Sequence, residues 1–201
     1  MASPDWNERF SGPGYAYGTE PNEFLVEVAT RLPAGPVLSL GEGEGRNGVY
    51  LAQLGHDVLA VDGSEMGLQK VRALASARGV EIRTEQARLE DYQIAPAQWA
   101  VILCFFVHME ASVREAVFRA AVDGLQPGGM FVLEAFGPGQ LAHGTGGPKE
   151  ATRLASLSQL QRELDGLEWV IAREGDRMLA EGIYHSGLSS TVQLLGRRSP
   201  T

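Results

Sequence analysis

The sequence predicts an α/β fold with an open, mostly parallel, seven-stranded sheet, helices on both faces and an antiparallel hairpin near the C-terminus. First, apolar strand-length runs alternate five times with helix-length segments, a pattern typical of a parallel sheet. Second, the 201 residues are 44% hydrophobic, which suits one compact domain with a substantial core. Third, the tail holds further strand-like runs with no helix between them. We therefore expect a single domain over residues 1–201.

The N-terminal segment divides into an arm and a helix. Residues 1–20 are rich in glycine, aromatic and charged residues and are expected to form an irregular arm. A helix is predicted from Pro21, because apolar residues recur at helical spacing: Phe24, Leu25, Val28, Ala29 and Leu32. The proline- and glycine-containing segment 33–36 then ends this helix.

Five buried strands are predicted for the parallel sheet, at 37–40, 58–61, 80–84, 101–106 and 130–136. The helices between them are predicted at 46–54, from a Ser64 cap to about Arg78, and around Val113, Val117 and Ala120. A sharp turn is expected at 126–129, just before the fifth strand. Each crossover should be right-handed.

The C-terminal part begins with a glycine-dense loop, 137–150. A helix should follow, since Leu154, Leu157, Leu160 and Leu164 mark one face. Strands are predicted at 168–173, 178–184 and 190–195, two of which should form a hairpin added to the sheet.

Composition excludes several classes of function. The chain has 25 acidic and 17 basic residues, a formal net charge of -8. A broad basic surface for phosphate backbones or anionic membranes is therefore not expected, and neither nucleic acid nor membrane is a predicted partner. Cys104 is the only cysteine, so no intramolecular disulfide or Cys-based zinc site can form. We expect a cytoplasmic protein without a metal, because the start of the chain lacks an apolar signal core and the histidines lack ligand spacing.

A glycine cluster follows the first predicted strand. Gly41, Gly43 and Gly45 alternate there, and a helix comes next. Asp62 ends the next strand, 17 residues beyond Gly45. A carboxylate at about this distance from such a turn typically accepts hydrogen bonds from ribose hydroxyls. The sequence therefore predicts a nucleoside in the crevice beyond the strands.

The identity of the nucleoside depends on charge. The segment 43–48 matches G-x-G-x-x-G, the fingerprint of dinucleotide binding, but Glu42 precedes it and Glu44 lies within it. These carboxylates would repel a pyrophosphate and tolerate a sulfonium that carries an ammonium group. An NAD-dependent oxidoreductase remains an alternative, disfavoured further by the lack of a Tyr-x-x-x-Lys motif.

At these residues the chain resembles the class I S-adenosylmethionine-dependent methyltransferases. The match consists of segment 38–45, Val61-Asp62 and segment 125–129, in order, within residues 22–136. Gly45-Arg46-Asn47 and the lead-in 17–22 resemble small bacterial tellurite-resistance and thiopurine-type members. The resemblance implies a Rossmann-like domain, S-adenosylmethionine as cofactor, S-adenosylhomocysteine as product and a small-molecule methyl acceptor.

The resemblance also implies a set of cofactor-binding positions. The glycines would wrap the methionine half, Asp62 the ribose, and segment 87–89 the adenine, with the arm 1–20 covering the site. Tyr17 would close over the sulfonium, or else only pack the arm. The expected cofactor-binding residues are Tyr17, Gly41, Glu42, Gly43, Gly45, Asn47, Asp62, Gly63, Ser64, Ala87, Arg88, Leu89 and Phe105.

Three positions depart from the family pattern. Ser39 and Arg88 stand where acidic residues are usual, and Ala100 replaces a frequent aspartate. Glu42 or Glu44 would have to substitute at the first position, and Glu90 or Asp91 at the second. These departures keep a second interpretation open, a non-catalytic protein that binds the cofactor.

Few residues are candidates for catalysis. Methyl transfer by direct displacement requires alignment and exclusion of water, and a thiol, chalcogen or other soft nucleophile needs no base. His108, at the end of the fourth strand, is the candidate base, although it could equally be a structural histidine. His143 lies in the glycine-dense loop, which could cover the acceptor. Tyr184 and His185 are expected to be core or surface residues.

Overall fold

The computed structural model describes residues 5–200 and confirms the predicted fold class. Seven strands form one sheet in the order β3-β2-β1-β4-β5-β7-β6. β1 to β5 run parallel, and β7 pairs antiparallel with both β5 and β6. The strands are β1 (Pro36–Leu40), β2 (Asp57–Asp62), β3 (Arg83–Gln86), β4 (Trp99–Phe105), β5 (Leu125–Phe136), β6 (Leu167–Glu181) and β7 (His185–Arg198).

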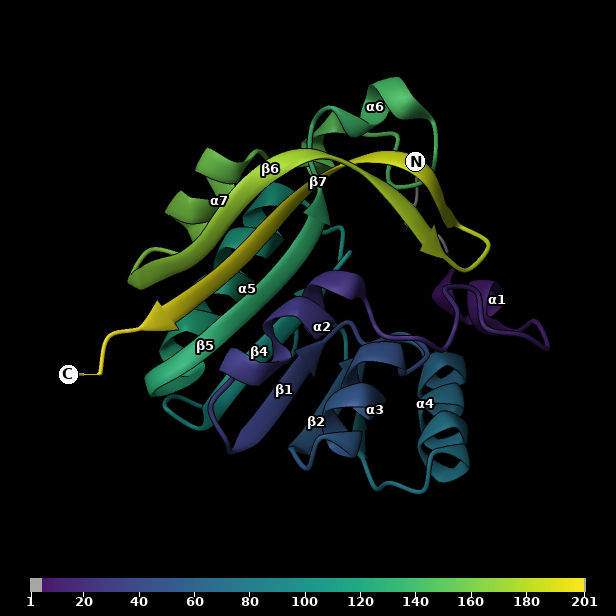
Figure 1. Cartoon of the computed structure of the whole chain (residues 1–201), viewed down its shortest axis with the longest axis horizontal. Coiled ribbons are helices and arrows are strands. Elements are labelled where there is room, and N and C mark those ends of the chain that lie inside the picture. Colours follow the sequence, from purple (N-terminus) through teal and green to yellow (C-terminus); the bar gives the residue numbers. More distant parts are fainter. Residues whose placement is uncertain (1–4, 201) are drawn as a thin grey trace.

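Helices cover both faces of the sheet (Figure 1). The α-helices are α1 (Trp6–Phe10), α2 (Glu23–Val28), α3 (Arg46–Gln53), α4 (Glu65–Ala77), α5 (Ala111–Gly124), α6 (Gln140–His143) and α7 (Leu157–Glu163). Two short 3-10 helices lie at Ala29–Arg31 and Ala151–Arg153. The predicted Ser64 cap forms, because its hydroxyl accepts the Gly67 N–H; the Asn22 side chain, which was not predicted as a cap, caps α2.

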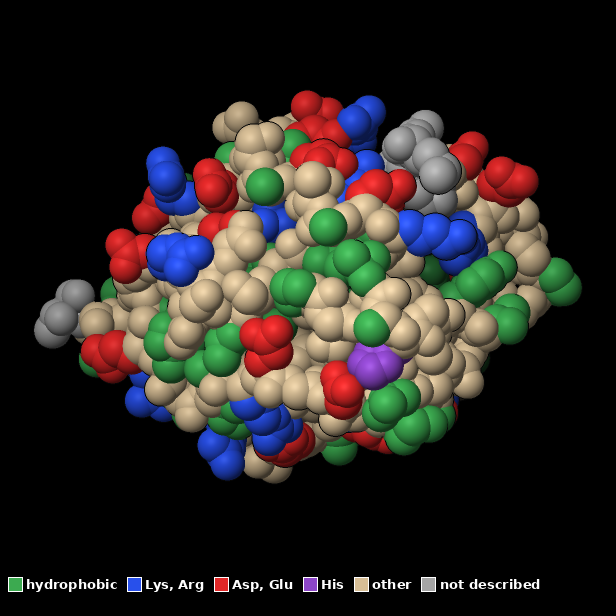
Figure 2. All heavy atoms as spheres, turned by 90° about the horizontal axis from the view of Figure 1, so that it is seen from above, with side chains coloured by type: hydrophobic (Ala, Val, Ile, Leu, Met, Phe, Trp, Pro, Cys, Tyr) green, Lys and Arg blue, Asp and Glu red, His purple; other side chains and the backbone are tan. Residues whose placement is uncertain are grey.

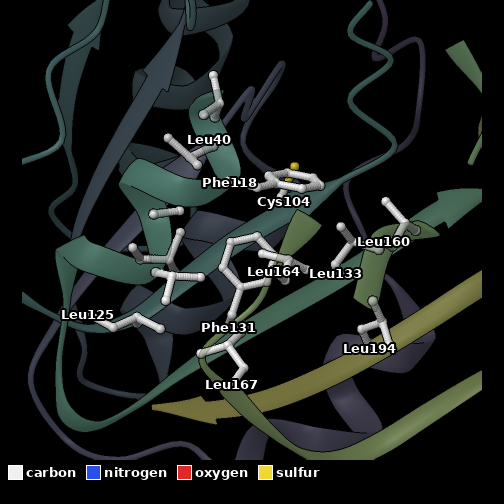
Figure 3. Close-up of a cluster of buried hydrophobic side chains, with 14 of the residues drawn as sticks. Leu40, Cys104, Phe118, Leu125, Phe131, Leu133, Leu160, Leu164, Leu167 and Leu194 are labelled. Atoms are coloured by element: carbon white, nitrogen blue, oxygen red, sulfur yellow. The ribbon is translucent and has the colours of Figure 1, made fainter. Parts of the chain in front are cut away.

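Two apolar layers hold the helices to the sheet. On one face, α5 and α7 pack over β1, β4 and β5, and Figure 3 shows Phe118, Phe131 and Leu164 together in this layer. On the other face, α2 and α3 pack over the alternate side chains of the same strands, including Val37, Val101 and Leu103. This alternation follows from the period of two along a strand. The buried strands therefore need to be apolar on both faces, as the sequence predicts.

Three boundaries differ from the predictions. The third strand begins at Arg83 rather than Val80, because the Val80 N–H closes α4 on the Ala75 carbonyl (3.0 Å). The turn expected at 126–129 is instead the irregular start of β5, where the register shifts opposite Trp99. The glycine-dense loop contains the short helix α6.

The C-terminal hairpin is simpler than expected. The runs 168–173 and 178–184 fall in one long strand, β6, which pairs with β7 from Leu167 to Glu181 apart from one irregularity. β6 is the edge strand, so the polar residues 174–177 need no apolar partner layer and interrupt the sequence pattern without interrupting the strand.

Candidate active site

The order of the sheet fixes where a ligand can sit. β1 leads to β2 and β3 on one side, and β4 lies on its other side, so the topology switches between β1 and β4. In open α/β sheets, ligands bind outside the carboxyl ends of the strands at this point. Gly41 follows β1 there, and Phe106 follows β4.

The glycine turn has the conformation that only glycine adopts readily. Gly41, Gly43 and Gly45 have φ angles of 64°, 66° and 104°. A Cβ on Gly41 would lie 2.5 Å from Val107 Cγ2, and one on Gly45 would lie 2.9 Å from Val71 Cα. The turn therefore requires glycine for both conformation and space at these two positions.

Asp62 closes the turn from the end of β2. Its two carboxylate oxygens accept the N–H groups of Gly43 and Ser64, each at 2.8 Å. Burial raises the pKa of Asp62, and the two backbone hydrogen bonds partly offset this. Each oxygen keeps a further lone pair, so the carboxylate can also accept hydroxyl groups of a ligand.

Glu42 brings a carboxylate to the position of Ser39. The Ser39 hydroxyl donates to Glu42 Oε2, and the Gly48 N–H donates to Glu42 Oε1 (2.7 Å). Burial raises the pKa of Glu42 to about 7, although these hydrogen bonds oppose the shift. An acidic group thus lies beside residue 39, supplied by a neighbouring residue of the turn.

The Glu44 carboxylate binds the backbone of the N-terminal arm. Its carboxylate accepts the Ala16 N–H (2.7 Å) and forms an ion pair with Lys70 (2.7 Å). Tyr17 donates to it through its N–H at 3.4 Å. Because Lys70 compensates this charge, Glu44 contributes little to the repulsion of a pyrophosphate, and the charge argument made from the sequence rests on Glu42 alone.

Helix α1 packs over the glycine turn. Phe10 is buried, and its ring lies 3.5 Å from a Cβ built on Gly43. Asn7 accepts the Ser64 hydroxyl (2.7 Å) at the start of α4. Further along the arm, the Ala16 carbonyl accepts the Ile183 N–H (2.9 Å) from the tip of the β6–β7 hairpin. The arm therefore joins the glycine turn to this hairpin.

The segment after β3 can contact a ligand mainly through its backbone. Ala87 and Leu89 are partly buried against the core, and the Ala87 N–H bonds to the Asp62 carbonyl (3.1 Å). Arg88 is 73% exposed, and its Nε donates to Glu90 (2.9 Å). The Arg88 side chain thus turns to Glu90, and so occupies the carboxylate expected to compensate for it. Gly63 lies nearby, its carbonyl accepting Gln86 Nε2 (3.3 Å).

A buried polar cluster joins the C-terminal hairpin to β5, α3 and the start of α2. We call it the Glu181 cluster. Its members come from α2, α3, β5, β6 and β7: Asn22, Arg46, Glu134, Arg177, Glu181, His185 and Gln193.

Glu181 is the centre of this cluster. It accepts Arg46 Nη2 (2.9 Å), Asn22 Nδ2 (2.8 Å) and a longer contact from His185 Nδ1 (3.4 Å). Burial opposes its ionisation, but the His185 hydrogen bond and the Arg46 charge hold its pKa at about 2. Asn47 supports the cluster, because its side chain accepts the Asn22 N–H (2.9 Å). Its amide oxygen therefore holds the chain rather than facing the crevice freely.

Aromatic rings surround His185. Its ring centroid lies 4.5 Å from that of Phe106, 4.6 Å from Tyr17 and 5.3 Å from Phe136. Phe106 has a φ of 54°, a strained conformation for a non-glycine residue and one that clusters at functional sites. Phe105, the preceding residue, is half-buried and packs against the core. The ring of Tyr17 thus faces the histidine rather than only the arm.

His108 lies next to a small internal cavity of about 10 Å³, lined also by Cys104, Arg114 and Phe136. Its ring stacks on Phe136 (5.5 Å), and Nε2 is buried without a partner among residues 5–200. Burial, with the nearby positive groups, lowers the pKa of His108 to about 3. The imidazole is therefore neutral and only weakly basic at this position.

The glycine-dense loop is attached to β7. Gln140 accepts the Ser190 N–H (2.9 Å), and the Thr145 hydroxyl donates to the Leu188 carbonyl (2.6 Å). A Cβ built on Gly146 would lie 3.9 Å from His185 Cδ2, so the loop passes over this histidine. His143 instead points to Asp176 (3.1 Å).

The residues that sequence reasoning missed are Glu181, His185 and Arg46. They are far apart along the chain and match no local motif. The available signals were weak: a glutamate and a histidine four residues apart at a predicted hairpin tip, and an arginine in the first turn of a buried helix.

The surface around the carboxyl ends of the strands is mixed in charge. Figure 2, which views this side from above, shows acidic and basic side chains interspersed. Within residues 5–200, no helix is long and apolar enough to cross a membrane. In the same residues, no group of three or more His, Cys, Asp or Glu side chains is arranged to hold a metal ion.

Comparisons with known proteins agree with this geometry. Residues 37–129, which contain the glycine turn and Asp62, match a family model described as a methyltransferase domain. A curated relative, 2-heptyl-1-hydroxyquinolin-4(1H)-one methyltransferase of Mycobacteroides abscessus, is 24% identical over 127 residues. The match covers 62% of this chain and 56% of the relative, so the chain spans little more than half the length of that protein.

Solved structures share the fold. TehB from Haemophilus influenzae superposes with a TM-score of 0.74 at 18% identity, covering 89% of this chain and 62% of that one. A protein crystallised in work on the conversion of a disulfide bond into a thioacetal group during echinomycin biosynthesis gives a TM-score of 0.73 at 19% identity, covering 94% and 86%. Together with the glycine turn, Asp62 and the sheet order, these matches make the chain similar to the S-adenosylmethionine-dependent methyltransferases.

Proposed function

We propose that this chain transfers the methyl group of S-adenosylmethionine to a small organic acceptor by direct displacement. The observation that carries the proposal is the turn of three positive-φ glycines at the β1/β4 switch, closed by the Asp62 carboxylate, which accepts the Gly43 N–H. The match of residues 37–129 to the methyltransferase family model supports the cofactor assignment.

The residues of the crevice fit this cofactor. Asp62 can accept ribose hydroxyls, and the backbone of 87–89 can border the adenine. Glu42 offers a carboxylate to the cofactor's amino group, in place of the acidic residue absent at Ser39. Arg46 Nη1 is buried without a partner in residues 5–200, and it lies in the first turn after the glycines. Such an orphaned cationic donor suits a ligand carboxylate, such as the one on the methionine half.

The chemistry divides between the cofactor and the chain. When bound, the cofactor supplies a methyl group already activated on a sulfonium. The glycine turn and Asp62 would hold it, while Phe10, Tyr17 and Phe106 would exclude water from the reacting atoms. Tyr17 would also present an aromatic face to the sulfonium charge. No protein nucleophile is required, and Cys104 is unsuited to be one because burial raises its pKa to about 12.

The rings around His185 support a planar aromatic acceptor. The curated relative is named for a planar heteroaromatic compound with a hydroxyl group, and the rings of Phe106, Tyr17 and Phe136 suit a planar acceptor of this kind. A hydroxyl or thiol on an aromatic ring is therefore favoured over an inorganic chalcogen species. The mixed surface charge supports a small molecule rather than a nucleic acid.

A methyl-transfer assay tests this proposal. The purified chain is incubated with methyl-labelled S-adenosylmethionine and 2-heptyl-1-hydroxyquinolin-4(1H)-one, 1-naphthol or 4-nitrothiophenol, and the labelled product is identified by mass. Label on at least one acceptor supports the proposal. Cofactor binding without transfer to these acceptors or to any component of a cell extract would instead support a non-catalytic binding protein, and tight binding of NAD alone would support an oxidoreductase.

A further inference from the structure

His185 has the surroundings of a base rather than of a structural histidine. Nδ1 is engaged by Glu181 Oε2 (3.4 Å), and Glu181 is itself held by Arg46 and Asn22. A carboxylate that binds one ring nitrogen fixes the tautomer and stabilises the imidazolium that forms when the other nitrogen takes a proton.

The second ring nitrogen of His185 remains available. Nε2 has no hydrogen-bond partner among residues 5–200. The buried polar side-chain atoms without a partner in that range are Arg46 Nη1, Trp99 Nε1 and His108 Nε2. His185 Nε2 is not one of these atoms, although the residue as a whole is only 6% exposed.

The position of His185 ties it to the crevice. Its ring contacts Phe106, the strained residue directly after β4, and Tyr17, whose backbone is bound to Glu44 of the glycine turn. Gly146 of the glycine-dense loop lies over the Cδ2 edge of the ring. His185 is therefore linked through Tyr17 to the glycine turn and lies against the glycine-dense loop.

We propose that His185, oriented by Glu181, is the base that takes a proton from a hydroxyl acceptor during methyl transfer. This inference rests on the function proposed above. The acceptor O–H proton passes to His185 Nε2, and the oxygen electron pair forms the bond to the methyl carbon. The carbon–sulfur bond breaks, and its electron pair stays on sulfur, which leaves neutral S-adenosylhomocysteine. The imidazolium, paired with Glu181, then returns its proton to solvent.

The charges that face His185 set the protonation state it needs. Burial lowers its pKa and so does Arg46, whereas Glu181 and Glu134 raise it. His108 is a further ionisable neighbour; Arg177 acts through its bonds to Glu134 and Glu181, and Tyr17 and Tyr184 lie beside the arm. The balance keeps the imidazole neutral at neutral pH, so it can accept a proton.

Histidine NMR tests the proposal without an acceptor. In the ¹⁵N-histidine-labelled full chain with S-adenosylhomocysteine, His185, assigned from a His185→Gln variant, should be neutral at neutral pH with its proton on Nδ1. A proton on Nε2 under these conditions would overturn the proposal, because that nitrogen could then not accept one.

Paired acceptors test the same step by rate. 1-Naphthol is a neutral hydroxyl at neutral pH, whereas 4-nitrothiophenol is already an anion. His185→Gln should slow methylation of the naphthol by at least about 100-fold, the lower range for loss of a general base, and leave the thiolate rate nearly unchanged. Equal losses with both acceptors would indicate a positioning role and overturn the proposal.

Two further variants sharpen the result. His108→Asn is the matched control, and it should keep the wild-type ratio of the naphthol rate to the thiolate rate. Glu181→Gln keeps a hydrogen-bond acceptor but removes the charge, so the acid limb of the naphthol rate should move to lower pH. If neither acceptor is methylated, the tautomer of His185 measured by NMR alone decides whether the proposed role as a base stands. Failure of the cofactor to bind in calorimetry would remove the proposed function, whereas transfer that is indifferent to His185 would remove only this inference.

Discussion

The two sides of the crevice are assembled in different ways. On the β2 side, Asp62 binds Gly43 and Ser64, residues 19 and 2 positions away along the chain. On the hairpin side, Glu181 binds Asn22 and Arg46 across 159 and 135 positions. The first side is a local motif that a sequence reveals, and the second exists only after the sheet has closed with β7 between β5 and β6. The first side also lies within residues 37–129, which match the methyltransferase family model, whereas Glu181 and His185 lie outside that segment.

The largest effect is expected from breaking the hairpin side. Glu134 is fully buried and binds Asn22 (2.6 Å), Arg177 (2.7 Å) and Gln193 (2.8 Å). Glu134→Ala removes the buried carboxylate that pairs with Arg177 and leaves the Gln193 Nε2 group without its partner, so the free energy of unfolding in urea should fall by about 3–5 kcal/mol.

The matched control for that variant is an exposed ion pair. Asp57 and Arg83 are 65% and 55% exposed, and Asp57→Ala should cost at most about 1 kcal/mol. Similar losses for the two variants would mean that the Glu181 cluster is no more important to stability than a surface pair.

The next effect concerns the cofactor side. Asp62→Ala should weaken binding of S-adenosylhomocysteine by about 1.5–3 kcal/mol, the range of a hydrogen bond to a charged group. Calorimetry measures the affinity, and circular dichroism checks that the variant is folded, because Asp62 also closes the glycine turn. An unchanged affinity in a folded variant would remove the ribose assignment.

A smaller effect is expected from Glu42, on the pH dependence of cofactor affinity. Its pKa is about 7 in the free protein, and a cationic amino group would favour its ionised form. The complex then binds fewer protons than the free protein, so cofactor affinity should fall as pH falls below 7, by up to about tenfold per pH unit. Glu42→Gln should flatten this dependence in calorimetric titrations. The same slope in both proteins would place the titrating group elsewhere.

The smallest effect is the change in the free energy of unfolding as the pH falls just below 6.5. The unfolded chain protonates His108 near 6.5, whereas the folded chain resists protonation until about pH 3. The unfolded state therefore binds more protons between these values, and stability should fall as pH drops below 6.5. His108→Asn should reduce this fall in urea titrations at several pH values. If the difference in unfolding free energy between wild type and variant does not change with pH, the low pKa of folded His108 is contradicted.

The sequence predicts the structure of the glycine turn and the place of Asp62 well, because these signals are local. Strand 37–40, the glycine turn and Asp62 form from residues close in sequence, and apolar runs mark strands buried on both faces. Side-chain directions are not predicted in this way: no local pattern indicates that the Arg88 side chain turns to Glu90.

The hairpin half could not be predicted, for physical reasons. The polar residues 174–177 are tolerated in an edge strand, so β6 shows no continuous apolar pattern. The Glu181 cluster takes its ionisable groups from four elements, α3, β5, β6 and β7, and only the tertiary fold brings them within hydrogen-bond distance. The sequence placed Tyr184 and His185 in core or surface, whereas the structure puts His185 beside Phe106 at the crevice.

The most direct test of the account is calorimetric titration of the purified protein with S-adenosylhomocysteine and, in parallel, with NAD. The glycine turn, Asp62 and Glu42 predict binding of S-adenosylhomocysteine in the micromolar range and no comparable binding of NAD. Absence of S-adenosylhomocysteine binding in the folded protein, or tighter binding of NAD, would contradict the assignment of this crevice.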